Sequence, residues 1–340
     1  MKKIFLIIPV ISTWLFGCQK EKPGTPASPA VVDVYVVETE YNSGFTIGMA
    51  KYWKNGQTVP LTDGTKNTET SSISVVGDDI YVTGWDFSGS IEVAKYWKNG
   101  QVTTLTDGSQ RAVASSIAIA GGNVYVAGTE VNTFGSSVAK YWKNGQVTTL
   151  TDPTVGASAS SIAVVGNDVY VAGDTYNGYH WVAKYWKNGQ ATALTNGTND
   201  ANASSMAVVG SDVYVSGWEY NGSYYKLKYW KNGQAVPLGD SATQVSKTSI
   251  AVAGTDVYVA TPDDGRVARY WKNGQAIPLT DGTKTALATS VMVVDSDVYV
   301  AGCEYNGSHF VAKYWKNGQA VSLTDGTKDT WPAKIVVIKR

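Results

Sequence analysis

A seven-residue phrase, Lys-Tyr-Trp-Lys-Asn-Gly-Gln, recurs along this chain and constrains its fold more than any other feature. With one variant that begins with Arg, the phrase occurs seven times. The steps between its successive tryptophans are 44, 45, 44, 44, 41 and 44 residues. A fixed period in this range is typical of a solenoid or a propeller, in which one structural unit is copied along the chain. The seven tryptophans are Trp53, Trp97, Trp142, Trp186, Trp230, Trp271 and Trp315.

Each period contains four short segments with the composition of β-strands. In one copy they are residues 160–165, 168–173, 180–187 and 190–195, all rich in β-branched or aromatic residues. A Gly-X-Asp turn or a close variant joins the first segment to the second. Asn-Gly joins the third to the fourth in every copy, and this pair favours the positive φ angles of a type I′ hairpin. Four antiparallel strands per unit, repeated seven times, predict an all-β, seven-bladed β-propeller.

The two ends of the chain predict how the ring closes. The second-strand segment occurs seven times, whereas the first-strand segment occurs only six times in the body of the chain. The seventh copy is Ala333–Ile338, so we expect this C-terminal strand to pair with Asp33–Val37 and close the ring. Residues 31–340 are therefore assigned to the propeller. The alternative is an open solenoid, which would expose strand edges and would need end repeats of different sequence to cap them.

The N-terminal residues have the features of a bacterial export signal. Lys2 and Lys3 precede an apolar run, Ile4–Phe16, which is too short to be a comfortable membrane span. The run leads into Leu15-Phe16-Gly17-Cys18, which resembles the lipobox of bacterial lipoproteins. The alternative is an ordinary signal peptide followed by a chance cysteine.

The lipobox resemblance implies a domain layout and a compartment. Residues 1–17 would be a lipoprotein signal peptide, and residues 18–30 would comprise a lipidated Cys18 and a flexible tether. The membrane partner would then be reached through the lipid, with the protein on the outer membrane of the cell envelope. The four residues after Cys18, Gln-Lys-Glu-Lys, resemble the export tag of surface lipoproteins of the Bacteroidetes group, which implies exposure on the cell surface.

The repeat phrase itself resembles the short YWKNG repeats of uncharacterised bacterial propeller lipoproteins. This resemblance covers nearly the whole mature chain. It implies a propeller fold and an envelope location, and it brings no known activity with it.

Composition excludes some partners. The formal net charge is zero and no basic stripe is present, so we expect no nucleic-acid partner. If Cys18 carries lipid, Cys303 is left alone and no disulfide framework exists. No metal-ligand spacing, nucleophile elbow or phosphate-binding loop occurs, so we expect no metal and no other cofactor. We expect a monomer.

Most repeated residues are interpreted as structural. Tyr and Trp alternate faces on the third strand, so we expect them to pack between blades. The basic residue before each Tyr-Trp pair is expected to lay its stem over a Tyr ring. The aspartates of the Leu-Thr-Asp-Gly ends could suggest calcium, but no copy has the alternating acidic loop of a calcium site, and a turn is favoured.

Functional residues are expected where the copies differ, which is mainly in two connections on one face. These are the loop between the second and third strands and the link from the fourth strand to the next first strand. The loops are aromatic, and an acid recurs two residues after the second strand ends. Candidate ligand-binding residues on this face are Trp85, Trp181, Trp218, Tyr220, Tyr225, Tyr305 and His309. The alternative is cross-strand packing within hairpins, such as Trp218 against Tyr225.

The sixth copy departs from the others. Its loop, Thr261-Pro262-Asp263-Asp264-Gly265, is three residues short. A short loop between taller neighbours predicts a notch, which adds Asp263 and Asp264 to the candidate site.

Two classes of function fit this sequence. One is a membrane-anchored, non-catalytic binding or scaffold module that presents the aromatic face to a glycan or protein ligand. The other is a polysaccharide-acting hydrolase or lyase. An enzyme needs groups with distinct roles, such as two carboxylates in different environments. The recurring acids are nearly equivalent by position, whereas near-identical blades suit repeated weak contacts. The binding module is therefore favoured.

Overall fold

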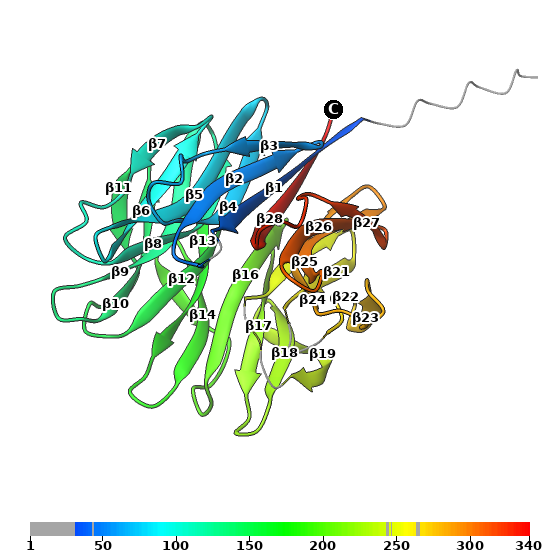
Figure 1. Ribbon diagram of the computed structural model, residues 1–340. Helices are drawn as coiled ribbons and strands as arrows, with labels where there is room; N and C mark the ends of the chain where they lie inside the picture. Colours follow the sequence, from blue (N-terminus) through cyan, green and yellow to red (C-terminus); the bar gives the residue numbers. More distant parts are fainter. Residues whose placement is uncertain (1–30, 43, 243–244, 246, 263–265) are drawn as a thin grey trace, which may run out of the picture. The chain divides into compact units, whose positions relative to one another are not determined.

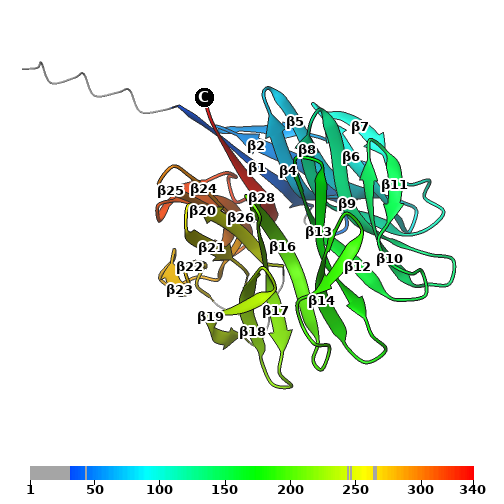
Figure 2. The same ribbon diagram turned by 180° about the vertical axis from the view of Figure 1, so that it is seen from behind.

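The computed structural model describes residues 31–340 except 43, 243–244, 246 and 263–265, and its regular structure in these residues is β-strand throughout (Figures 1 and 2). Val32–Arg340 form one compact unit. Within the described residues, no helix has the length and apolar character needed to cross a membrane. The proposed signal peptide, Cys18 and tether lie outside the described residues.

The described residues form seven four-stranded antiparallel sheets, which we number as blades 1–7 along the chain. The first strands are β28 (Thr330–Lys339), β4 (Thr68–Val76), β8 (Ala112–Ala120), β12 (Ala157–Val165), β16 (Ala201–Val209), β20 (Ser249–Ala253) and β24 (Ala286–Val294). The second strands are β1 (Val32–Tyr41), β5 (Asp79–Ser88), β9 (Asn123–Val131), β13 (Asp168–Tyr176), β17 (Asp212–Tyr220), β21 (Asp256–Ala260) and β25 (Asp297–Tyr305). The third strands are β2 (Gly48–Lys54), β6 (Ile91–Lys98), β10 (Ser137–Lys143), β14 (Trp181–Lys187), β18 (Tyr225–Lys231), β22 (Arg269–Lys272) and β26 (Phe310–Lys316). The fourth strands are β3 (Gln57–Pro60), β7 (Gln101–Thr104), β11 (Gln146–Thr149), β15 (Gln190–Ala193), β19 (Gln234–Ala242), β23 (Gln275–Pro278) and β27 (Gln319–Ser322).

The first strands form the inner ring of the propeller. Each contacts the first strand of the next blade, from β4 round to β24, then to β28 and back to β4. β28 pairs antiparallel with β1, with Ile338 opposite Asp33 and Lys334 opposite Val37. Ile335, Val336 and Val337 are buried in the closing strand. The predicted seven-bladed propeller and its closure by the C-terminal strand are confirmed.

The two repeated turns hold one another together. In each blade the Asn of the Asn-Gly turn has φ between 48° and 51°, and the following Gly also has positive φ, as a type I′ turn requires. The Asn55 side chain donates to Asp33 Oδ1 at 2.6 Å and accepts from the Val34 backbone N–H at 2.8 Å. The same clasp recurs around the ring, for example between Asn188 and Asp168. The Asp of the second strand is thus the partner of the hairpin turn beside it.

The Tyr-Trp pairs pack between blades, as expected. The seven tryptophans are 1–5% exposed, and seven hydrophobic clusters each join two neighbouring blades. Trp230 of blade 5, for example, packs against a cluster that includes Tyr170 and Leu194 of blade 4, while Tyr185 of blade 4 faces the same cluster. Because each blade buries both faces, the core is distributed over the seven interfaces.

A β-bulge extends most inner strands beyond the sequence prediction. The first strand of blade 4 was expected at residues 160–165, whereas β12 begins at Ala157 and its register shifts between Ala159 and Ser161. The bulge brings a backbone carbonyl close to the second strand. A Cβ on Gly173 would lie 2.0 Å from the Ser158 carbonyl oxygen, so this position requires Gly.

Candidate functional site

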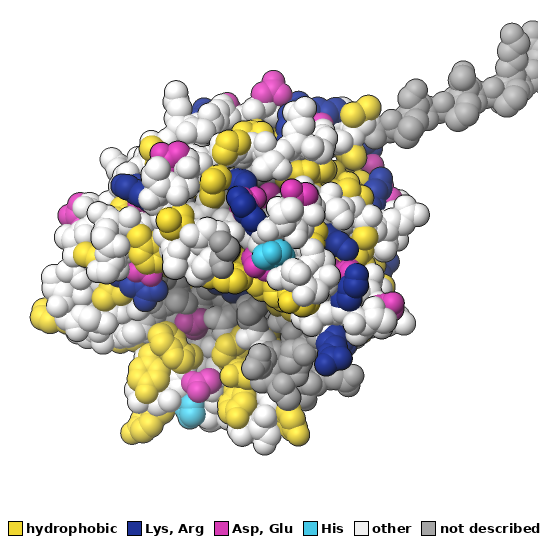
Figure 3. All heavy atoms as spheres, in the orientation of Figure 1, with side chains coloured by type: hydrophobic (Ala, Val, Ile, Leu, Met, Phe, Trp, Pro, Cys, Tyr) yellow, Lys and Arg dark blue, Asp and Glu magenta, His cyan; other side chains and the backbone are white. Residues whose placement is uncertain are grey.

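The variable loops of the blades lie at the end opposite the Asn-Gly turns. The pairing of Thr68 with Asp86 shows that an inner strand begins where the second strand of its blade ends. The link into the blade and the loop after its second strand therefore lie on one face, which we call the loop face. Figure 3 shows hydrophobic side chains gathered at its lower edge, where the β13–β14 and β17–β18 hairpins end in Figure 1.

The candidate aromatic residues pack in pairs across the hairpins. Trp218 and Tyr220 each contact Tyr225, with ring centroids 4.8 and 4.9 Å apart. Tyr305 contacts Phe310 at 5.3 Å. The cross-strand interpretation is confirmed for these residues. Trp85 on β5 is half-buried and lies opposite Ala94, so it has no aromatic partner across its hairpin.

Several of these rings nevertheless remain open to solvent. Tyr176 and Trp181 lie 5.6 Å apart, and they are 40% and 36% exposed. Tyr179 at the hairpin tip is 84% exposed, and Tyr224 of the neighbouring blade is 48% exposed. Exposed aromatic rings gathered on neighbouring hairpins mark an interaction surface more often than single exposed apolar residues do.

An Asp in the link between blades 4 and 5 joins these hairpins. Asp200 Oδ1 accepts a hydrogen bond from the Trp181 backbone N–H at 2.8 Å and lies 3.5 Å from His180 Nδ1. The Asp200 backbone carbonyl accepts from the Tyr220 N–H at 2.7 Å. The His180 and Asp200 side chains are 38% and 43% exposed, respectively, although His180 Nδ1 itself is buried and makes no hydrogen bond with any described residue.

The same arrangement recurs between blades 7 and 1. Asp329 accepts from the Phe310 backbone N–H at 2.7 Å and lies 2.9 Å from His309 Nδ1. Its backbone carbonyl accepts from the Tyr41 N–H at 2.9 Å. Tyr305 takes the place of Tyr176. The second site is more closed, because Trp331 covers Phe310 at 4.6 Å and Asp329 is only 10% exposed.

The two histidines of the chain therefore mark two aromatic–His–Asp sites that are related in sequence and differ in how open they are. Both loops read Tyr-Asn-Gly-X-His followed by an aromatic residue, and both links end in Asp. His309, Tyr305 and Trp181 were predicted from the loops. Asp200 and Asp329 were missed, although their shared position after two matching loops was a signal for them.

The recurring acids of the loop face that the structure describes are ion-paired. Glu40, Asp86, Glu130, Glu219 and Glu304 each form an ion pair with the basic residue that opens the repeat phrase of the same blade. The expectation that this first lysine covers a Tyr ring is wrong. The lysine after the Tyr-Trp pair does so instead, at 5.1–5.4 Å from a ring centroid in all seven blades.

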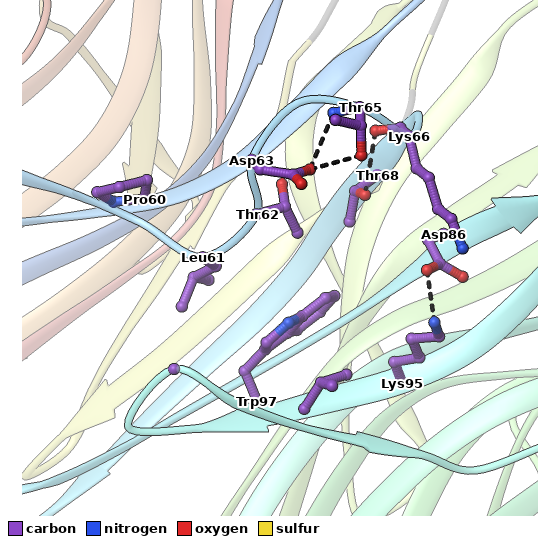
Figure 4. Close-up of a pocket in the computed structure, with 12 residues that line it drawn as sticks. Pro60, Leu61, Thr62, Asp63, Thr65, Lys66, Thr68, Asp86, Lys95 and Trp97 are labelled. Atoms are coloured by element: carbon purple, nitrogen blue, oxygen red, sulfur yellow. Dashed lines mark hydrogen bonds and ion pairs between the residues drawn. The ribbon is translucent and has the colours of Figure 1, made fainter.

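Two grooves between blades share nearly the same lining. One, of about 590 Å³, lies between blades 1 and 2 over Trp97 (Figure 4). The other, of about 580 Å³, lies between blades 6 and 7 beside Trp315. In each groove, the Asp of the Leu-Thr-Asp-Gly segment accepts hydrogen bonds from the Thr two residues later. Asp63 accepts from Thr65 in the first groove, and Asp281 accepts from Thr283 in the second. These bonds, which lower the Asp pKa, confirm the turn interpretation of the Leu-Thr-Asp-Gly ends.

The predicted notch depends on Asp263 and Asp264, which lie outside the described residues. Among the described residues, a cavity of about 310 Å³ is lined by Arg266, Lys284 and Tyr305, among others. Among the described residues, no three His, Cys, Asp or Glu side chains cluster as metal ligands would. Cys303 is a buried thiol, and burial raises its pKa to about 12.

No protein-family model matches the chain, and no curated protein matches it in sequence. Solved structures are similar in fold. A puromycin-hydrolysing peptidase of Mycobacterium tuberculosis matches with a TM-score of 0.56 at 12% identity, over 86% of this chain and 51% of that one. An acylaminoacyl peptidase of Pyrococcus horikoshii matches with a TM-score of 0.50 at 13% identity, over 86% and 51%. TolB of Acinetobacter baumannii matches with a TM-score of 0.48 at 11% identity, over 88% of this chain and 66% of TolB.

The likenesses to the two peptidases show the fold alone. The chain spans about half the length of the two peptidases. Function therefore has to be argued from the loop face itself.

Proposed function

We propose that this protein is a non-catalytic binding module that recognises a glycan through its two aromatic–His–Asp sites. The observation that carries this proposal is the duplication of the site between blades 4 and 5 and between blades 7 and 1. Sugar rings present apolar C–H faces that pack on aromatic rings, and hydroxyl groups that bond to polar side chains. Trp181 with Tyr176 supplies the first kind of surface, and the His180–Asp200 pair supplies the second.

Two related sites on one ring favour a repetitive ligand. A polymer that reaches both sites would bind more tightly than a ligand of one site, because binding at the first site holds the polymer close to the second. The paired acids favour binding over catalysis, because each is held in the same ion pair with a lysine of its own blade, whereas an enzyme needs carboxylates in distinct environments. The competing hydrolase or lyase would need a second catalytic group beside one of the His–Asp pairs.

Replacing Tyr176 and Trp181 together by Ala should weaken glycan binding. Removing a stacking surface at the centre of a site costs about 2 kcal/mol, or roughly 30-fold in affinity. The measurement is a glycan array followed by titration of the best ligand. Because both rings are partly exposed, the melting temperature should change little.

A matched control lies on the opposite face. Lys187→Ala removes an exposed turn-face lysine that pairs with Asp168, and it should leave binding unchanged. Loss of binding in the Lys187 variant but not in the aromatic variant would refute the proposal. Turnover of a bound polysaccharide would favour the enzyme instead, and binding only to a protein would replace the glycan.

Membrane attachment through lipid on Cys18 is part of the same proposal. Cys18→Ser should move the protein from the membrane fraction to the soluble fraction, because the lipobox resemblance places the lipid on that thiol. Fractionation of cells followed by immunodetection measures this. A Cys18→Ser protein that stays with the membranes would overturn the lipoprotein interpretation.

A further inference from the structure

The axis of the propeller contains a small polar chamber. It has a volume of about 80 Å³, enough for two or three waters at about 30 Å³ each. Twelve of its described lining residues are Ser or Thr, two from each of six blades. The remaining described lining residues are Lys247, Ala333 and Lys334. The described lining therefore carries two ammonium groups and no carboxylate.

Five serines of the chamber each accept a hydrogen bond from the backbone of the next blade, whereas other lining hydroxyls, such as that of Ser71, already donate to a protein acceptor. Ser116 Oγ accepts from the Ile162 backbone N–H of the next blade at 3.3 Å, and Ser161 Oγ accepts from Met206 N–H at 3.2 Å. Ser205, Ser249 and Ser290 repeat this contact around the ring. An oxygen that already accepts from the backbone keeps its own O–H for another acceptor.

The pattern breaks at Lys334 and Ser72. Lys334 occupies the position that is Ser in the other six blades, and an ammonium group cannot accept a backbone N–H. In the neighbouring blade, the buried Ser72 hydroxyl has no hydrogen-bond partner among the described residues. Two donors without acceptors thus lie in the same layer of neighbouring inner strands.

Lys334 also lacks a charged partner. No hydrogen bond or ion pair joins its ammonium group to any residue that the structure describes, and burial lowers its pKa. Lys247 differs, because Glu69 partly offsets the lowering of its pKa by burial. An enclosed charge is costly unless it is paired.

We propose that the axial chamber binds a small inorganic anion, held by the Lys334 ammonium group and the surrounding serine hydroxyls. The anion supplies the acceptor that Lys334 and Ser72 lack, and it offsets the positive charge of the chamber. This site is independent of the glycan sites on the loop face.

Titration calorimetry of the full chain with inorganic phosphate and, separately, with chloride tests the proposal. The matched variant is Lys334→Ser, which installs the residue that the other six blades carry and should therefore fold. At least one anion should bind the parent protein, and Lys334→Ser should weaken that binding by about 10- to 100-fold, the value of a lost charged hydrogen bond. Lys187→Ser, on the turn face, should bind as the parent does.

Thermal melts give a second readout. In buffer without small anions, Lys334→Ser should melt at or above the parent temperature, because the unpaired charge is gone. Adding the bound anion should raise the melting temperature of the parent more than that of Lys334→Ser. The proposal fails if neither anion binds the parent, or if Lys334→Ser binds as tightly as the parent.

Discussion

Deleting residues 332–340 should abolish the cooperative native fold. These residues hold most of β28, which closes the ring by pairing with β1. Ile335, Val336 and Val337 are at most 9% exposed. Burial of each aliphatic side chain contributes about 1.5–3 kcal/mol, so the three contribute about 5–9 kcal/mol. This is comparable to the whole free energy of unfolding of a typical domain, about 5–15 kcal/mol.

Circular dichroism melts and gel filtration measure the effect. The truncated protein should be aggregated or lack a cooperative transition, because two strand edges become exposed. A shorter deletion of Lys339 and Arg340 is the control, since it removes their ion pairs with Asp295, Asp33 and Asp78 but leaves the buried part of β28, and it should have a much smaller effect. A 332–340 deletion as stable as this control would contradict closure by β28.

Glu38→Gln should make the protein more stable at alkaline pH. The Glu38 side chain is fully buried, and neither carboxylate oxygen has a hydrogen-bond partner among the described residues. Burial raises its pKa from 4.5 to about 7. The folded state therefore binds more protons than the unfolded state between these two values. The free energy of unfolding should fall as pH rises from about 4.5 to about 7, and then level off.

The size of this effect follows from the shift in pKa. At 1.36 kcal/mol per unit, the ionised Glu38 costs about 3 kcal/mol above pH 7. Gln is neutral at every pH, so urea unfolding of Glu38→Gln at pH 8 should show a free energy of unfolding higher than that of the parent by this amount, and at pH 4.5 no difference. The free energy of unfolding of the variant should still depend on pH, because burial also raises the pKa of Asp174 to about 6.

Glu40→Gln is the matched control two residues away on β1. Burial alone would raise the Glu40 pKa, but hydrogen bonds from Lys51 and Lys328 outweigh it, and the net pKa is lowered. This carboxylate stabilises the fold above its unfolded pKa, so its replacement should lower stability at pH 8. If Glu38→Gln is also less stable than the parent at pH 8, the buried Glu38 carboxylate does not destabilise the fold at that pH.

The blade count, the strand order and the closing strand could be predicted because they depend on local signals. Asn-Gly fixes a hairpin wherever it falls between two strands, and seven copies of one phrase count the blades. The β-bulge could not be predicted in this way. It depends on how a carbonyl such as that of Ser158 meets the second strand across the sheet, and the extra length of β12 follows from that contact.

The site was predicted less completely than the fold. Aromatic loops indicated the loop face and named Trp181, Tyr305 and His309 of the proposed sites. The partners Asp200 and Asp329 lie 20 residues further along the chain and reach their histidines only once two blades pack together. The pairing of each acid with its repeat lysine, such as Glu219 with Lys228, was missed for the same reason, because hairpin register decides which side chains meet.

The Gly positions opposite the bulges limit how interchangeable the near-identical copies are. In blades 2, 3, 4, 5 and 7, a Cβ at this position would lie 1.9–2.2 Å from a carbonyl oxygen of the inner strand. β1 carries Glu38 there, opposite Pro332 of β28, although β28 has the same register shift. The blade that joins the two ends of the chain therefore holds a side chain where five other blades require Gly, so its first two strands are not exchangeable with theirs.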